Sequence, residues 1–521
     1  MTNALDATAP HQREPLNTDL SLHLLARLVG ASYVTQEPRE PERLTTACAR
    51  VSLTVRLAAA GPAGLSDASV ASAAAALACR ARTTDERTTP MTPTLHATYD
   101  GLSPETARTY RLLGAGEQTV IDVNSTAAAC AMELEDAATH LRSLAAVRLL
   151  EERHDRPWAG AFFRFRDEVR EHARQRAVEE ETGAGVEEAV RRWLDWFLLT
   201  CTRAERILTP AHRLMDRDVQ YEPAQEPPFQ DEDGALAWLE VHLSDLEVAV
   251  RAAEERGWDV LVWQLVHSAW PLFHRLRPLE LWVDLHQRGL AAARRCGHRA
   301  AQREMLTTLV IGLRGLDRHA EAIERAAEAL QLAREDGDAR SESQALHETG
   351  VALHAQHEGE RAVPVLVEAI AIRERVGYER GVGLSRIILG LVHLEADRIP
   401  EAIKQLTLAL TELELCHDRF DAARAAAWLG RARARAGEFV KATDLLTGAL
   451  RDFRGLGSAP WQARVLHLLG ATAEEQQHLD RALQLYAQAL ALADSAAPQD
   501  AEHYREALSR VTDARNKEET P

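Results

Sequence analysis

Residues 350–369 read GVALHAQHEGERAVPVLVEA, and the pattern within them recurs along the chain at a step of forty residues. Ala362 follows Gly350 by twelve residues, and Leu366 and Ala369 then follow at i+4 and i+7. This spacing indicates a small residue at a helix crossing, a turn, and the apolar stripe of a second helix. The recurring positions are Gly350, Gly390, Gly430 and Gly470; Ala322, Ala362, Ala402, Ala442 and Ala482; and Ala329, Ala369, Ala409, Ala449 and Ala489. Such a period predicts a stacked array of helix pairs.

The pattern resembles the tetratricopeptide repeat (TPR), whose consensus has glycine at position 8 and alanine at positions 20 and 27. Gly350, Ala362 and Ala369 fit these positions. The usual TPR period is about 34 residues, so we expect the additional residues to lengthen both helices. Helix breaks are predicted at Gly337, Gly377, Gly457 and His417.

Composition limits the classes of function. A chain of 521 residues is too long for one ordinary core. Its net charge of −18 argues against non-specific adhesion to nucleic acid or membranes. The six cysteines have no paired spacing, which is typical of a reducing compartment. The chain has no run of eighteen apolar residues, and its first twenty residues lack the apolar core of a signal peptide. We therefore expect a cytoplasmic protein.

The chain divides at weak boundaries into five predicted segments. We expect an all-α protein with a small β-wing, in which a winged-helix-like domain precedes a TPR α-solenoid superhelix. Pro104 marks one helix start, two helices are expected at about 124–132 and 134–148, and residues 162–165 form the wing. The segments are a disordered lead (1–20), an ARC-like helical segment (21–90), the winged-helix-like domain (95–175), a helical docking region with a degenerate repeat (186–300), and about five forty-residue units (301–515).

Several stretches resemble bacterial NB-ARC/TPR regulators of the STAND class, as found among SARP-type antibiotic regulators. Residues 25–30 and 48–58 look like the helical ARC subdomain of these regulators. Residues 99–104 and 110–114 resemble the opening of their winged helix, and residues 163–167 resemble its closing motif. Residues 237–239, 263–265 and 270–273 resemble the region that joins the winged helix to the repeats. The resemblance implies a regulator connected with secondary metabolism and antibiotic biosynthesis.

Departures from this family concern nucleotide binding. The family has an ATPase core with a phosphate-binding lysine, whereas this sequence contains no G-x-x-x-x-G-K-[ST]. The Gly-Leu-Pro-Leu of the family aligns with residues 50–53, which read RVSL. The family's His-Asp pair, whose histidine reaches bound ADP, aligns with Arg166 and Asp167. We predict that the chain has lost the nucleotide switch and requires no cofactor.

A partner-binding groove is predicted from the TPR positions that usually line the concave face. These positions contain four arginines beside an apolar patch. The predicted groove residues are Gln344, His347, His354, Leu384, Ile387, Leu391, Arg424, Arg431, Arg435, Arg464 and His467. Because guanidinium groups bind carboxylates in bidentate fashion, we expect an acidic protein or peptide with an apolar anchor. The alternative is an arginine-rich helix face that is simply solvated.

Other functions have weaker support. The predicted reading helix of the winged helix begins with Glu133, Glu135 and Asp136, where DNA phosphates would lie, so we do not expect nucleic acid as a partner. No residue set has catalytic or metal-binding spacing, although catalysis is not excluded. The favoured function is a non-enzymatic interaction scaffold or regulator. A homodimer is compatible with this function. The alternatives are an accessory or catalytic protein of a peptide or natural-product pathway and a DNA-binding regulator.

Overall fold

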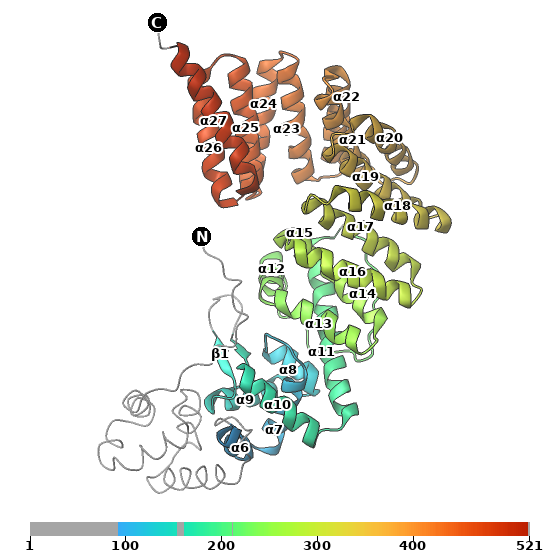
Figure 1. Ribbon diagram of the computed structural model, residues 1–521, viewed down its shortest axis with the longest axis vertical. Coiled ribbons are helices and arrows are strands. Elements are labelled where there is room, and N and C mark those ends of the chain that lie inside the picture. The colour runs from blue at the N-terminus through green and yellow to red at the C-terminus, as the bar shows by residue number, and fades with distance from the viewer. Residues whose placement is uncertain (1–91, 154–160, 211, 497, 519–521) are drawn as a thin grey trace, which may run out of the picture. The chain divides into compact units, whose positions relative to one another are not determined.

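The computed structural model describes residues 92–153, 161–210, 212–496 and 498–518. The chain divides into two compact units, with the boundary in sequence between Pro278 and Leu279. The helices of each unit are labelled in Figure 1. Helices dominate both units, and the described residues contain one sheet of two short strands. The predicted lead (1–20) and ARC-like segment (21–90) lie outside the described residues. None of the described helices combines the length and apolar character that crossing a bilayer requires.

The first unit begins with helices around a small β-hairpin. Strand β1 pairs antiparallel with β2, and Ile121 forms an isolated bridge to Phe163. Pro104 opens its helix as predicted, and the Ser103 hydroxyl caps this helix by accepting a hydrogen bond from the backbone N–H of Thr106. The elements are α6 (Thr92–Asp100), α7 (Pro104–Ala115), α8 (Val123–Cys130), α9 (Leu134–Ala146), β1 (Glu151–Arg153), β2 (Phe162–Arg164) and α10 (Asp167–Glu180). The segment thus contains helices followed by a short hairpin, and its interpretation as a winged helix stays a prediction.

A tryptophan-rich helical region completes the first unit. It contains α11 (Gly183–Leu208), α12 (Glu232–Val241), α13 (Leu243–Glu255), α14 (Asp259–Ser268) and α15 (Trp270–Leu276). Trp193 and Trp196 lie three residues apart on α11, so they share a helix face, and both are buried. Trp238 packs on Trp196 with ring centroids 6.0 Å apart. These aromatic side chains form the core of this region.

The second unit is an array of helices of nearly equal length, stacked in sequence order (Figure 1). Its helices are α16 (Leu279–Arg295), α17 (Arg299–Gly315), α18 (His319–Asp336), α19 (Ala339–Ala355), α20 (Gly359–Arg375), α21 (Glu379–Glu395), α22 (Ile399–Leu415), α23 (Arg419–Arg435), α24 (Phe439–Gly455), α25 (Ala459–Glu475), α26 (Leu479–Ala496) and α27 (Pro498–Glu518). Each helix from α19 to α25 has 17 residues. A connection such as 356–358 then completes a step of twenty residues, so the two helices of a pair account for the period.

The connections repeat with the same step as the helices. Their middle residues have positive φ and are Gly297, Asp317, Gly337, His357, Gly377, Asp397, His417, Gly437, Gly457 and Gln477. This left-handed conformation ends a helix sharply and is least costly for glycine. The four predicted helix breaks, His417 included, therefore lie at turn positions.

The recurring glycines lie where helices of a pair cross closely. A Cβ atom at Gly350 would lie 2.5 Å from Leu366 Cδ2, and one at Gly390 would lie 2.6 Å from Leu406 Cγ. Both leucines are fully buried. The glycine thus provides the space into which the leucine of the second helix packs, which explains why both positions recur at forty residues.

Candidate functional site

The predicted groove residues lie on α19, α21, α23 and α25, which are the first helices of successive pairs. The structure therefore brings them to equivalent positions on neighbouring helices. Their exposure differs: His347 and Ile387 are buried, whereas Leu384, Leu391 and His354 are half-buried. Ile387 belongs to the core of the array and not to its surface. The apolar patch that a partner can reach is consequently reduced to Leu384 and Leu391.

All four groove arginines have carboxylate partners within the chain. Arg424 pairs with Asp421 on its own helix, and its guanidinium lies over the Trp461 ring. The other pairs are Arg431 with Glu475 at 2.8 Å, Arg435 with Asp397 at 2.9 Å and Arg464 with Asp500 at 2.8 Å. An acidic ligand would have to compete with these carboxylates. The structure thus places the arginines on the predicted helices and also shows their charge to be largely compensated.

Four ion pairs connect one first helix to the next first helix, and a fifth connects Arg435 of α23 to Asp397 in the turn after α21. We call this set the ion-pair ladder: Arg314–Glu348, Arg435–Asp397, Arg431–Glu475, Arg464–Asp500 and Arg510–Glu474. The gap between α19 and α21 is spanned by His354 Nε2, which lies 3.0 Å from Glu395 Oε1. Except for the buried Glu348, the members are partly exposed, so each exposed pair stabilises the array only modestly, by about 0–1 kcal/mol.

A buried guanidinium immobilises two of the predicted groove residues. Arg373 of α20 is fully buried and donates to the backbone oxygen of Gly381 at 2.6 Å, to Ser385 Oγ at 2.7 Å and to Gln344 Oε1 at 2.7 Å. Burial lowers the pKa of Arg373 to about 10. His347 Nδ1 lies 3.1 Å from Ser385 Oγ, and burial together with nearby arginine charge holds the His347 pKa well below its usual range. Gln344 and the neutral His347 are therefore structural residues.

His467 is also held in a packed environment. Its ring stacks on Tyr504 with centroids 4.9 Å apart and contacts Tyr486 at 5.2 Å and His503 at 4.8 Å. Burial, with nearby positive charge, lowers the pKa of His467 to about 3. The side chain is neutral at physiological pH and packs among aromatic rings.

One cluster with metal-ligand chemistry escaped the sequence analysis. Glu205, His212 and His267 place their ligand atoms within 4.8 Å of one another. Arg217 already pairs with this carboxylate, however, since its Nη2 lies 2.7 Å from Glu205 Oε2 and 3.1 Å from His267 Nδ1. His212 Nδ1 lies 2.6 Å from Glu205 Oε1. The cluster is a buried ion pair with histidine partners, and a cation would have to displace the guanidinium.

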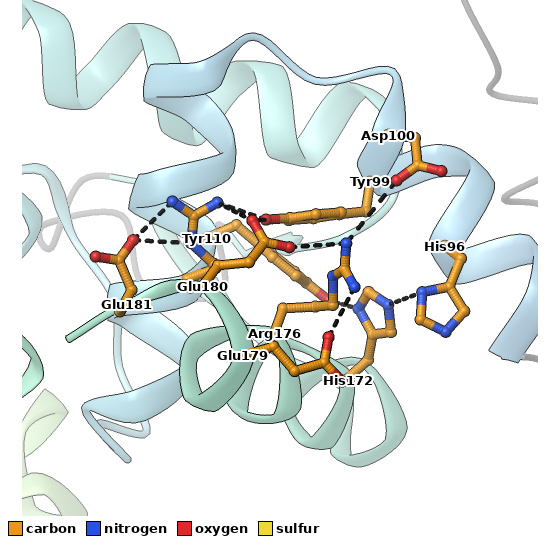
Figure 2. A network of polar contacts seen from close by, with 10 residues as sticks. His96, Tyr99, Asp100, Tyr110, His172, Arg176, Glu179, Glu180 and Glu181 are labelled. Atoms are coloured by element: carbon orange, nitrogen blue, oxygen red, sulfur yellow. Dashed lines mark hydrogen bonds and ion pairs between the residues drawn. The ribbon is translucent and has the colours of Figure 1, made fainter. Parts of the chain in front are cut away.

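A second polar network ties α10 to α6 and α7 (Figure 2). Tyr110 is fully buried, and its hydroxyl donates to the backbone oxygen of Val169 at 2.9 Å and lies 2.9 Å from His172 Nδ1. Burial lowers the pKa of His172 to about 4. Tyr99 donates to Glu180 Oε2 at 2.7 Å. The segments 99–104 and 110–114, singled out from the sequence, are thus joined to α10 through side-chain hydrogen bonds.

Comparison with known proteins identifies the repeats. The family model described as tetratricopeptide repeat matches residues 421–495. Together with the helix pairs of the second unit, this match defines an all-α protein with a TPR array, as predicted.

The chain is also similar to curated regulators. It is 27% identical over 401 residues to regulatory protein AfsR of Streptomyces griseus, covering 75% of this chain and 40% of the relative. It is 31% identical over 256 residues to regulatory protein AfsR of Streptomyces coelicolor, covering 47% of this chain and 24% of the relative. The chain thus spans less than half the length of either relative.

Among solved structures, a STAND protein with a tetratricopeptide repeat sensor from Pyrococcus horikoshii is similar at 12% identity with a TM-score of 0.41. The similarity covers 96% of this chain and 70% of that one.

Proposed function

We propose that this protein is a regulator whose TPR array docks a partner protein or peptide on the first-helix face. The observation that supports the proposal is the regular array itself, in which α19, α21, α23 and α25 are the first helices of successive pairs. In this proposal an apolar anchor of the partner contacts Leu384 and Leu391. Acidic side chains of the partner then exchange with the intramolecular carboxylates that hold Arg431 and Arg435.

We further propose that nucleotide does not control this regulator. At the position where the resembling family has a histidine that reaches ADP, this chain has Arg166, which pairs with Glu151 of β1. A guanidinium has donors only and is already paired here, so Arg166 cannot accept a hydrogen bond from a nucleotide as a histidine ring can. We expect calorimetric titration with ATP or ADP to show no binding in the micromolar range.

Two features favour protein over DNA as the partner of the winged-helix-like region. The first turn of α9 contains exposed Glu135 and Asp136, which would repel phosphates. His140, one of two basic groups on this helix, lies 2.9 Å from Thr106 Oγ1 through its Nδ1 and so is engaged within the domain. A gel-shift titration at about 150 mM salt should show no complex, since the favourable phosphate contacts are missing.

The docking face can be tested by affinity capture from native lysate. Leu391→Arg places a charged side chain at the reachable apolar position, so it should abolish capture of the partner. Val367→Arg is the matched control, because Val367 is 50% exposed on α20 and does not belong to the predicted groove. Reversing Arg431 and Arg435 would be a poorer test, since it also breaks two ion pairs. Equal capture by wild type, Leu391→Arg and Val367→Arg would refute docking on this face.

A further inference from the structure

A second surface of the array has its own recognition chemistry. A cavity of about 570 Å³ lies between α22 and α24, with the N-terminal half of α23 as its floor. Ala426 contributes to the floor, and Leu410 and Leu445 supply apolar walls. Gly448 widens the cavity, because a Cβ atom at this position would meet no heavy atom within 4 Å. This volume lies within the range of about 300–1,000 Å³ that small-ligand pockets occupy.

The cavity is rimmed mainly by acidic side chains. The lining includes the carboxylates of Glu414, Asp418, Asp444 and Asp452, and two residues that can carry positive charge, His417 and Arg419. Asp418 is engaged, since Arg380 Nε donates to its Oδ2 at 2.6 Å. Within the part of the chain that the structure describes, the side chains of Glu414, Asp444 and Asp452 make no hydrogen bond or ion pair. The apolar walls thus end in carboxylates that have no cation.

The preceding repeat shows what the same carboxylate positions bind. Arg386, forty residues before Ala426, extends from α21 into the gap between α20 and α22. Its Nη2 donates to Glu374 Oε1 at 2.6 Å, its Nε donates to Glu412 Oε1 at 2.9 Å, and its Nη1 donates to Gln405 Oε1 at 3.1 Å. One guanidinium therefore joins carboxylates of two successive second helices.

In the next gap the carboxylates are retained and the guanidinium is missing. Glu414 and Asp452 stand forty residues after Glu374 and Glu412, whereas Ala426 replaces the arginine. At the same position the neighbouring repeats have Leu346 and Leu466, both buried in their gaps.

We propose that the cavity between α22 and α24 binds an arginine side chain of a partner protein. The guanidinium lies between Glu414 and Asp452, and an apolar residue beside it contacts Leu410 and Leu445. Arginine suits this site because its planar group donates to two carboxylates at once, as Arg386 does.

This surface is separate from the docking face proposed above. At 100° per residue, Ala422 and Ala426 lie on the side of α23 away from Arg424 and Arg431. The proposal of an arginine site is therefore independent of the proposal of docking on the first-helix face. Leu391→Arg should leave arginine binding unchanged.

The probe for the arginine site is the peptide acetyl-Ala-Arg-Leu-amide, titrated into the full chain by NMR or calorimetry. We expect saturable binding that weakens at least tenfold when citrulline replaces arginine, because citrulline has the same shape without the charge. Replacement by lysine should weaken binding as well, since an ammonium cannot reproduce the two-carboxylate geometry. Absence of binding at about 10 mM peptide, or equal binding of the citrulline peptide, would overturn the proposal.

Variants of the chain locate the binding. Ala426→Arg should place an internal guanidinium in the cavity, abolish peptide binding and raise the Tm, as the arrangement around Arg386 implies. Glu414→Gln with Asp452→Asn should weaken binding at least tenfold. Glu401→Gln is the matched control, because Glu401 is exposed on α22 and does not line the cavity. Undiminished binding by folded Ala426→Arg protein would show that the peptide binds elsewhere and refute the assignment.

Discussion

Alanine in place of Gly470 should destabilise the α25–α26 pair, whereas alanine in place of Gly448 should stabilise α24. A Cβ atom at Gly470 would lie 2.7 Å from Tyr486 Cε1 and 2.8 Å from Tyr486 Cδ1. Tyr486 cannot easily retreat, since it is fully buried and its hydroxyl donates to Glu474 Oε2 at 2.7 Å. At Gly448 the same methyl group meets nothing within 4 Å.

The expected magnitudes follow from two opposing effects. Overpacking a close-packed site costs about 1–3 kcal/mol, and the rigid ring places Gly470 near the upper value. Replacing a helical glycine by alanine gains about 1 kcal/mol from helix propensity. We therefore expect a loss of about 2 kcal/mol at Gly470 and a gain of about 1 kcal/mol at Gly448. The two variants should differ by about 3 kcal/mol, or about 150-fold in a local opening equilibrium.

Amide hydrogen exchange followed by mass spectrometry is the suitable assay, because repeat arrays open locally and not only as a whole. Peptides from α25 and α26 should exchange faster in Gly470→Ala, and peptides from α24 should exchange more slowly in Gly448→Ala. Peptides from α6 to α10 provide the internal control, since they belong to the other unit. If both substitutions change exchange in the same direction, the steric explanation of the forty-residue glycine register is wrong.

Three further outcomes are expected. Asp122 and Asp245 raise the pKa of buried His242 to about 9. This histidine therefore stabilises the first unit fully below pH 6.5 and progressively less as the pH rises to about 9. His242→Asn should remove this dependence of stability on pH from urea denaturation midpoints measured between pH 6 and 9. Arg386→Ala should lower the free energy of unfolding of α20–α22 by about 1–3 kcal/mol through lost charge-assisted hydrogen bonds, seen as faster amide exchange there. His172, whose pKa is about 4 because of burial, destabilises the first unit as the pH falls from 6.5 to 4, and His172→Gln should flatten thermal melts over that window.

The array was predictable because its determinants are periodic and local. Gly350 and Leu366 contact each other within one helix pair. The turn residues recur every twenty residues, so a single sequence contains several copies of the same signal. The β-hairpin was anticipated for a similar reason, since Phe162 and Phe163 stand out as apolar residues beside polar sequence.

The burial and the ion-pair partners of the predicted groove residues could not be predicted from the same pattern. Arg435 is positioned as expected, but its partner Asp397 lies in a turn 38 residues away, and side-chain direction decides whether the two meet. His347 occupies a predicted groove position and yet is buried, with its ring next to Ser385 of α21, to which Arg373 of α20 also donates. The arginine site was visible in principle, by aligning Arg386 with Ala426, but only the structure shows which carboxylates surround each of them.

The ion-pair ladder adds electrostatic attraction between successive repeats along the first helices of the array. Raising the salt concentration from about 0.1 to 1 M shortens the Debye length from about 10 to 3 Å. This screening weakens partly exposed ion pairs such as Arg435–Asp397. The apolar contacts between helices persist under the same conditions, because salt does not screen them. We therefore expect the array to bend more easily as the ionic strength rises, while its helices stay intact.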